Sequence, residues 1–252
     1  MSGAMRVKIG EDWQEDREAL LAALRDFAPL LEGAPFRNRY GLRGVSAFAL
    51  FWFLRQVRPD MVFEVGVWRG FSTWLIEQAV PKARIHCLDP MVMLQGFMSR
   101  WKLGRTYRSG RATYSGDDFS CAPIAELIGP HTRPLAFFDD HQNKLPRLLQ
   151  CRAAGICDIV FDDNMADAGT HRSLEDDLRD PDRRHLLERE IEIYEVFPAL
   201  WPVDARIGTL HLVEPGLDFP IEPALRRVYD ERQWHSSVTY VRLRAEPLEP
   251  SG

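Results

Sequence analysis

The sequence predicts an α/β fold, a three-layer αβα sandwich in which a mostly parallel, doubly wound sheet of seven strands lies between two layers of helices. Short apolar runs recur along the chain and alternate with stretches of helical spacing, which is typical of βαβ units with right-handed crossovers. Four of these runs end in acidic residues, as expected where parallel strands end at a ligand-binding edge. The predicted strands are 61–63, 83–89, 112–118, 135–141, 158–164, 207–213 and 237–243.

Three further segments are expected to be helices. Apolar positions recur at helical intervals over 12–28, after which Pro29 discourages continuation. The apolar run 47–54 suits a helix buried on several sides, either against the sheet or in the subunit interface of a homo-oligomer. A helix over 186–197 is expected to stop near Pro198.

The chain is expected to form a single domain over residues 1–252. Residues 1–58 are interpreted as a helical extension that covers a cofactor cleft, although the loop 36–44 within it is as easily a solvated connection. The charged segment 165–184 is either a lid over the site or a solvated connection.

Composition and charge exclude several classes of function. A net charge of -5 argues against a general binder of nucleic acid. No apolar run reaches the roughly 20 residues that a membrane span needs, and no basic and apolar leader is seen at the amino terminus. The same net charge favours a small-molecule substrate. The four cysteines lack the spacing of a zinc site or a disulfide framework, so a reduced, cytoplasmic setting is expected.

The run from Glu64 to Ser72 is the most informative motif. It joins the strand-like residues 61–63 to a helix-like segment, and it contains Gly66 and Gly70. Glycine suits a sharp strand-to-helix turn, where the backbone needs a positive φ or a ligand approaches closely. The helix start adds unpaired amides and a positive dipole end. The motif indicates a cofactor pocket, and a turn that binds nothing is the alternative.

The spacing of the motif narrows the kind of cofactor. It is Gly-x-x-x-Gly, not the dinucleotide pattern Gly-x-Gly-x-x-Gly, and the carboxylate of Glu64 would repel a pyrophosphate but suit a cationic sulfonium. The run resembles the first motif of class I S-adenosylmethionine-dependent methyltransferases, which implies a Rossmann-like fold with an antiparallel last strand. The resemblance also implies that Asp89 binds the ribose and that Asp117 or Asp118 meets the adenine. A surface-turn role is the alternative for Asp89.

Acidic side chains also follow the fourth and fifth predicted strands, in Asp139-Asp140-His141 and Asp162-Asp163-Asn164. Oxygen ligands of this kind suit Mg²⁺, and crowded carboxylates repel unless a cation or a proton relieves them. The pair resembles the metal site of catechol O-methyltransferase and related metal-dependent O-methyltransferases, and macrolide-sugar and aminocoumarin-sugar O-methyltransferases use a similar acid cluster. The resemblance implies Mg²⁺ or another divalent cation at Asp140, Asp163 and Asn164. Helix and loop capping by these acids is the alternative.

The sequence departs from this resemblance at the general base. Those enzymes carry a lysine separated by one residue from the Asp-His pair, whereas Gln142 and Asn143 intervene here before Lys144. His141 therefore competes with Lys144 as the base, and a neutral structural role for His141 stays open.

The resulting hypothesis is Mg²⁺-assisted methyl transfer from S-adenosylmethionine to a hydroxyl of a small molecule, such as a phenol, a sugar or another natural product. Two alternatives remain. Asp-Asp-His also resembles the metal motif of nucleotide-sugar glycosyltransferases, and the broken lysine pattern is compatible with a methyltransferase fold that binds without catalysis. Trp68 and Trp74 are interpreted as packing residues.

Overall fold

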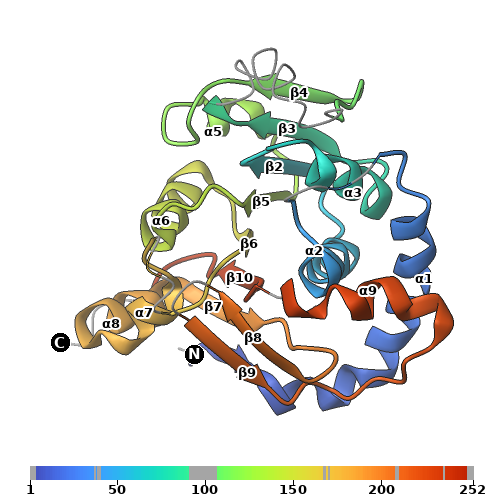
Figure 1. Cartoon of the computed structure of the whole chain (residues 1–252). Helices are drawn as coiled ribbons and strands as arrows, with labels where there is room; N and C mark the ends of the chain where they lie inside the picture. Colours follow the sequence, from blue (N-terminus) through green and yellow to red (C-terminus); the bar gives the residue numbers. More distant parts are fainter. Residues whose placement is uncertain are drawn as a thin grey trace.

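An eight-stranded sheet forms the centre of the molecule in the computed structural model (Figure 1). The structure describes residues 4–36, 38, 41–90, 107–166, 169, 171–207, 210–234 and 236–248. The strand order is β1-β7-β10-β6-β5-β2-β3-β4. The strands are β1 (Arg6–Lys8), β2 (Met61–Val65), β3 (Arg84–Leu88), β4 (Ala112–Ser115), β5 (Pro134–Phe138), β6 (Asp158–Phe161), β7 (Ile191–Val196) and β10 (Thr239–Leu243).

The directions of the strands follow the prediction. The strands β4, β3, β2, β5 and β6 pair in parallel with one another, and β1 pairs in parallel with β7. The last strand, β10, lies between β6 and β7 and is antiparallel to both. The predicted mixed α/β sheet with an antiparallel last strand is therefore confirmed.

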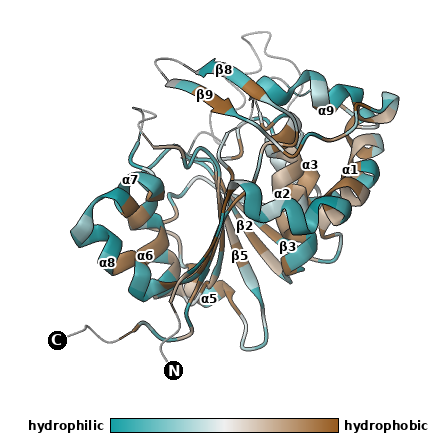
Figure 2. Cartoon of the chain, turned by 90° about the horizontal axis from the view of Figure 1, so that it is seen from below, coloured by the Kyte–Doolittle hydropathy of each residue, from teal (hydrophilic) through white to brown (hydrophobic). Residues whose placement is uncertain are grey.

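Helices cover both faces of the sheet and give the predicted three layers (Figure 2). Alternate residues of the buried strands face opposite layers, as the pleat requires. Thus Val62 belongs to the core beneath α1, α2 and α3, whereas Phe63 belongs to the core beneath α6 and α7. The helices are α1 (Arg17–Glu32), α2 (Gly44–Val57), α3 (Phe71–Ala79), α5 (Ile124–Leu127), α6 (Lys144–Ala154), α7 (Leu174–Arg179), α8 (Pro181–Glu190) and α9 (Arg226–Asp230).

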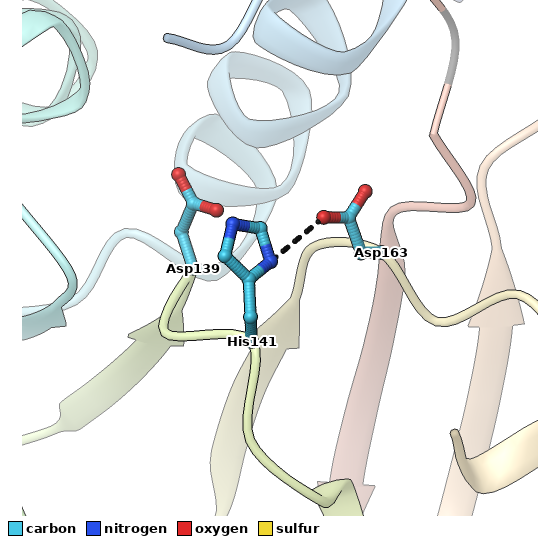
Figure 3. A group of neighbouring side chains, drawn as sticks. All are labelled: Asp139, His141 and Asp163. Carbon is cyan, nitrogen blue, oxygen red and sulfur yellow. Dashed lines mark ion pairs between the residues drawn. The ribbon is translucent and has the colours of Figure 1, made fainter. Parts of the chain in front are cut away.

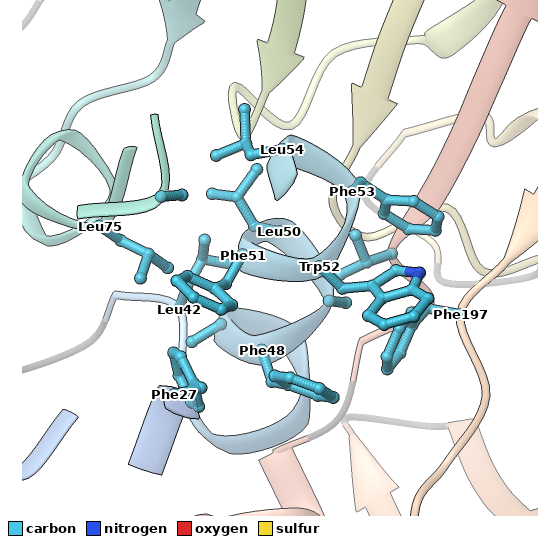
Figure 4. Close-up of a cluster of buried hydrophobic side chains, with 14 of the residues drawn as sticks. Phe27, Leu42, Phe48, Leu50, Phe51, Trp52, Phe53, Leu54, Leu75 and Phe197 are labelled. Atoms are coloured by element: carbon cyan, nitrogen blue, oxygen red, sulfur yellow. The ribbon is translucent and has the colours of Figure 1, made fainter. Parts of the chain in front are cut away.

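The apolar helix α2 is buried on all sides within the chain. Every residue from Gly44 to Leu54 is buried, and Figure 4 shows large side chains leaving this helix in several directions. Phe48 packs against Phe27 of α1, with ring centroids 5.5 Å apart, and against Phe197, at 5.7 Å. The chain itself thus supplies the partners of this apolar run. No helix in the described part of the chain has both the length and the apolar character needed to cross a membrane.

The first helix has different bounds from those predicted. A 3₁₀ helix over Gly10–Asp16 precedes α1, and α1 continues through Pro29 to Glu32. The chain leaves α1 at Gly33, which is the residue type favoured at such an end.

The predicted helix 186–197 is wrong over its second half. The helix α8 begins at Pro181, with the Asp180 side chain accepting a hydrogen bond from the Arg183 amide, and it ends at Glu190. The next six residues, Ile-Glu-Ile-Tyr-Glu-Val, form β7. Their β-branched and aromatic side chains favour a strand, and the ladder with β10 overrides the helical spacing at the start of the segment.

The predicted strand 207–213 is also wrong as a member of the main sheet. Residues 208 and 209 lie outside the described residues, and the flanking segments form an antiparallel pair, β8 (Val203–Ile207) and β9 (Leu210–Glu214). This hairpin is a separate two-stranded sheet. The strand β7 takes the predicted strand's place, and β1 adds the eighth strand at the edge.

Candidate active site

The loop between β2 and α3 turns sharply at its two glycines. Gly66 and Gly70 have φ values of +91° and +82°, in the left-handed region that glycine adopts most readily. A Cβ on Gly66 would lie 2.3 Å from the carbonyl oxygen of Asp139, and one on Gly70 would lie 2.3 Å from that of Tyr107. Glycine therefore lets the loop pack against the residue after β5 at Gly66 and against Tyr107 at Gly70.

The carboxylate of Glu64 is buried behind this loop. It accepts hydrogen bonds from Oγ of Ser72, from Oγ1 of Thr73 at 2.6 Å and from Sγ of Cys87 at 3.1 Å. Burial raises the pKa of Glu64 to about 7, although the two hydroxyl hydrogen bonds oppose the shift. Neither Glu64 nor Ser72 is among the residues that line the neighbouring cavity. The pair instead holds the first turn of α3 against β2.

Asp89, immediately after β3, fixes the loop from the other side. Its Oδ2 accepts hydrogen bonds from the amides of Val67, at 2.9 Å, and Trp68, at 3.1 Å. Asp89 also lines the cavity, and its contact with a ribose stays a prediction.

A cavity of about 1120 Å³ lies over the carboxyl ends of the parallel strands. Eight aspartates and three arginines line it, so acidic side chains predominate. The described residues of 165–184 do not line it; residues 167, 168 and 170 of that predicted lid lie outside the described residues. The lining residues are Gly41, Leu42, Arg43, Ser46, Val65, Gly66, Trp68, Leu88, Asp89, Pro90, Asp117, Asp118, Asp139, Asp140, His141, Gln142, Arg147, Asp162, Asp163, Asp204, Arg206, Gln233 and Ser236.

Arg147 of α6 joins two of the predicted site residues. Its guanidinium donates two hydrogen bonds to Asp118, at 3.0 and 2.6 Å, and one from Nε to Asp140 at 2.8 Å. The bond to Arg147 holds the pKa of Asp118 well below its usual range. The side chain of Asp117, by contrast, is exposed and accepts a hydrogen bond from Ser115.

Asn164 is buried in a complete hydrogen-bond network away from the cavity. Its amide nitrogen donates to Tyr194 Oη at 2.9 Å and to Thr239 Oγ1 at 3.0 Å, and its oxygen accepts from the Leu174 amide at 2.7 Å. Asn164 is not among the cavity-lining residues. The structure thus places this predicted metal ligand as a link between the end of β6, α7 and β10.

Asp139, His141 and Asp163 converge at the carboxyl ends of β5 and β6 (Figure 3). One ligand atom from each of the three lies within 4.8 Å of the other two. Nδ1 of His141 lies 3.0 Å from Oδ2 of Asp163, and this bond raises the pKa of His141 above its ordinary value. Figure 3 shows the imidazole between the two carboxylates. His141 therefore has an orienting acid on one side and lines the cavity.

Asp139 and the neighbouring Asp162 are poorly solvated. Burial raises the pKa of Asp139 well above its usual value, and Asp162 adds to the effect. Burial, together with the neighbouring Asp163, also raises the pKa of Asp162 to about 7. Ser236 donates a hydrogen bond to Asp162. Asp139 forms no hydrogen bond or ion pair through its side chain within the described structure, so its carboxylate is left to the cavity.

Lys144, the other predicted base, is completely buried at the start of α6 and does not line the cavity. Its Nζ has no hydrogen-bond partner among the described atoms. Burial lowers the pKa of Lys144, whereas the carboxylates of Asp140 and Asp162 oppose the shift. The structure thus brings His141, and not Lys144, to the cavity wall.

Backbone strain is concentrated around the cavity. Trp68, His141 and Asp163 have φ values of 46°, 51° and 52°, and all three line the cavity. Residues other than glycine rarely adopt this region, and such outliers gather at functional sites. The Trp74 side chain is buried, as interpreted from the sequence, but that of Trp68 is 38% exposed within the cavity wall.

Sequence reasoning missed several cavity residues. Asp139 and Asp162 stand in the same motifs as the chosen acids but one residue earlier, and only the structure shows which acid of each pair faces which neighbour. Arg147 could not be recognised from the sequence as a site residue, because its partners Asp118 and Asp140 come from two other loops. Asp204 and Arg206 belong to β8, nearly all of which lies before the predicted strand 207–213.

Comparison with known proteins gives matches among solved structures. No protein-family model matches the chain, and no curated protein matches it. The antiparallel β10 between β6 and β7, in an otherwise parallel sheet, decides the fold. The chain has a class I methyltransferase fold.

Several solved methyltransferases are similar at low identity. An S-adenosylmethionine-dependent O-methyltransferase from Thermotoga maritima is 12% identical, with 91% of this chain and 73% of that chain covered and a TM-score of 0.44. The O-methyltransferase TomG from Streptomyces achromogenes is 13% identical over 90% and 89% of the two chains, with a TM-score of 0.42. Methyltransferase PaMTH1 from Podospora anserina is 15% identical over 89% and 88%, with a TM-score of 0.41. Because these sequence identities and TM-scores are low, the assignment of the methyltransferase fold rests on the order and direction of the strands.

Proposed function

We propose that this chain transfers a methyl group from S-adenosylmethionine to a hydroxyl group of a small molecule. One observation carries the proposal: a single cavity joins the glycine loop and Asp89 to the His141–Asp163 pair. Its volume of about 1120 Å³ exceeds the roughly 300–1,000 Å³ of a typical ligand pocket, so there is room for a cofactor and an acceptor.

The charge of the cavity supports a cationic cofactor. Arg147 is shared between Asp118 and Asp140, so the arginines do not balance the eight aspartates of the wall. Excess negative charge attracts a sulfonium and repels the diphosphate of a nucleotide sugar. S-adenosylmethionine would supply an electrophilic methyl group on a positively charged sulfur. The same charge counts against the glycosyltransferase alternative.

His141 is placed to accept the proton of the acceptor hydroxyl. Asp163 binds Nδ1, which leaves the other ring nitrogen to act as the base and stabilises the imidazolium that forms. The unpaired carboxylate of Asp139, within the same group, would orient the hydroxyl as a hydrogen-bond acceptor.

The predicted Mg²⁺ set does not fit this arrangement. Asn164 has its hydrogen bonds completed by protein groups, and Asp140 is held by Arg147. Among the described histidine, cysteine and acidic side chains, those that converge with Asp163 are Asp139 and His141, and Asp140 is not part of this group. No step of the proposed reaction is assigned to a metal ion.

Cofactor binding is the first test. We expect S-adenosylmethionine to bind the purified protein with one site per chain by isothermal calorimetry. Replacement of Asp89 by alanine removes the acceptor that holds two loop amides, so the dissociation constant should rise about 10- to 100-fold. Asp60→Ala, which changes an exposed acid just before β2, is the matched control and should bind normally.

Three outcomes would count against the proposal. If the folded wild-type protein does not bind S-adenosylmethionine, the proposed function is rejected. If a nucleotide sugar raises the melting temperature and S-adenosylmethionine does not, the glycosyltransferase alternative is favoured. Cofactor binding without turnover on any hydroxylated acceptor would favour a binding protein.

The pH profile of kcat/KM tests the role of His141. The base must be neutral, so turnover should fall as the pH decreases through the pKa of His141, which the bond to Asp163 raises. In Asp163→Asn this raising effect is lost, and the acidic limb should move to lower pH while the maximal rate decreases. An acidic limb that stays at the same pH in Asp163→Asn would show that another group controls it.

A further inference from the structure

The acids that were predicted to bind a metal already have partners in the protein. Nδ1 of His141 lies against Asp163, and the guanidinium of Arg147 lies against Asp140. Asn164 donates both side-chain amide hydrogens to neighbouring side chains, and its side-chain oxygen accepts a hydrogen bond from a backbone amide. A divalent ion at the predicted ligands would have to displace these bonds.

Arg147 occupies a position that is suited to neutralising two strand ends at once. Its side chain is 5% exposed and contacts Asp118, beyond β4, and Asp140, beyond β5. The N···O distances are 2.6 Å to Asp118 and 2.7 Å to Asp140. Short, multidentate contacts of a buried guanidinium with carboxylates are among the strongest ion pairs in proteins. One fixed cation thus bridges two carboxylates, as a divalent ion would.

The amine of Lys144 is buried below the same acids. Burial lowers the pKa of Lys144, although four nearby aspartates oppose this shift. Three basic side chains thus lie on α6 or on the loop before it: His141, Lys144 and Arg147. All three fall within a segment of seven residues, 141–147.

We infer that the cavity works without a divalent metal ion, because Arg147 and His141 take the places at Asp140 and Asp163 that the ion would need. This inference rests on the proposed function. It has a consequence for the substrate: an acceptor that chelates a metal ion must offer two adjacent oxygens, whereas a general base needs only one hydroxyl. The acceptor class is then a molecule with a single hydroxyl at the site, with no need for a vicinal diol.

The test is a titration with Mn²⁺ in which electron paramagnetic resonance measures the concentration of the free ion. For the wild-type protein we expect no stoichiometric binding up to about 1 mM Mn²⁺. Arg147→Met removes the guanidinium but keeps an unbranched apolar side chain, and it should raise Mn²⁺ affinity about tenfold or more, since Asp118 and Asp140 lose their counter-ion.

Arg152→Met is the matched control. It removes an arginine of the same helix that is paired with Glu190 and backbone carbonyls, outside the cavity-lining residues. It should bind Mn²⁺ as weakly as the wild type. If folded Arg147→Met gains no affinity over Arg152→Met, the role given to the guanidinium is refuted.

The rival site is the group Asp139, His141 and Asp163, whose ligand atoms lie within 4.8 Å of one another. Binding of one Mn²⁺ per wild-type chain at micromolar concentration, lost in Asp163→Asn, would overturn the inference. If Arg147→Met does not fold, this wild-type titration decides the question alone. S-adenosylmethionine binding, measured on the same samples, reports separately on the proposed function, so the two failures are distinguishable.

Discussion

Replacement of His141 by asparagine is expected to reduce kcat about 10²- to 10⁴-fold, the usual contribution of a positioned general base. The dissociation constant of S-adenosylmethionine should stay nearly unchanged, because the loop is held by Asp89 and Glu64. Asparagine is chosen because His141 has a φ of 51°, and asparagine tolerates this region better than most residues. The variant should therefore fold while losing the imidazole.

Steady-state kinetics and calorimetry on the same preparation measure both quantities. His131→Asn is the control, because His131 is exposed in the turn before β5, outside the residues that line the cavity. Turnover of His141→Asn within threefold of the wild type would contradict the role given to His141. Equal loss of turnover in His131→Asn would point to a general effect on the fold.

Replacement of Gly66 by alanine is expected to have the largest effect on the fold and on cofactor binding. The added Cβ would lie 2.3 Å from the carbonyl oxygen of Asp139, at a backbone φ of +91°. We expect a loss of about 3–5 kcal/mol in the free energy of unfolding, since left-handed strain of roughly 1–2 kcal/mol adds to the cost of overpacking. Displacement of the loop should weaken S-adenosylmethionine binding at least about tenfold.

Gly155→Ala separates the two costs. Gly155 has a φ of +79° at the end of α6, but nothing lies within 4 Å of its added Cβ. This variant should lose only the strain, about 1–2 kcal/mol, and should bind cofactor normally. Denaturant unfolding of both variants gives the comparison. Equal losses of stability in the two would show that the loop relaxes away from Asp139.

The sheet was predictable because its determinants are local. Apolar runs such as Phe63 with its neighbours, and Gly66 and Gly70 in the turn, favour a strand, a turn and a helix start within nine or ten residues of one another. The prediction of a helix over residues 191–196 was wrong for the opposite reason. The structure of this segment is decided by pairing with β10, nearly 50 residues later in the chain, and the preceding helical spacing gave no sign of that partner.

The sequence motifs that contribute to the site could be predicted, but the contacts of the individual side chains could not. Successive residues beyond a strand face different neighbours, so Asp139 lies beside His141 whereas Asp140 lies beside Arg147. The sequence does not show at which residue the side chains stop alternating between the two faces of the sheet. Likewise, Glu64 lies in β2 just before the loop, and its buried carboxylate accepts a hydrogen bond from the hydroxyl of Thr73 instead of facing the cavity.

The place of β10 has a consequence for how the molecule is made on the ribosome. The strands β2 to β6 emerge in an order that lets parallel neighbours pair as synthesis proceeds, but β10 fills the gap between β6 and β7. That gap exposes two strand edges until residues 239–243 have left the exit tunnel. The centre of the sheet is thus completed only once residues 239–243 have been made, and because long-range pairing is slow, we expect these strand edges to stay exposed to aggregation until β10 has paired.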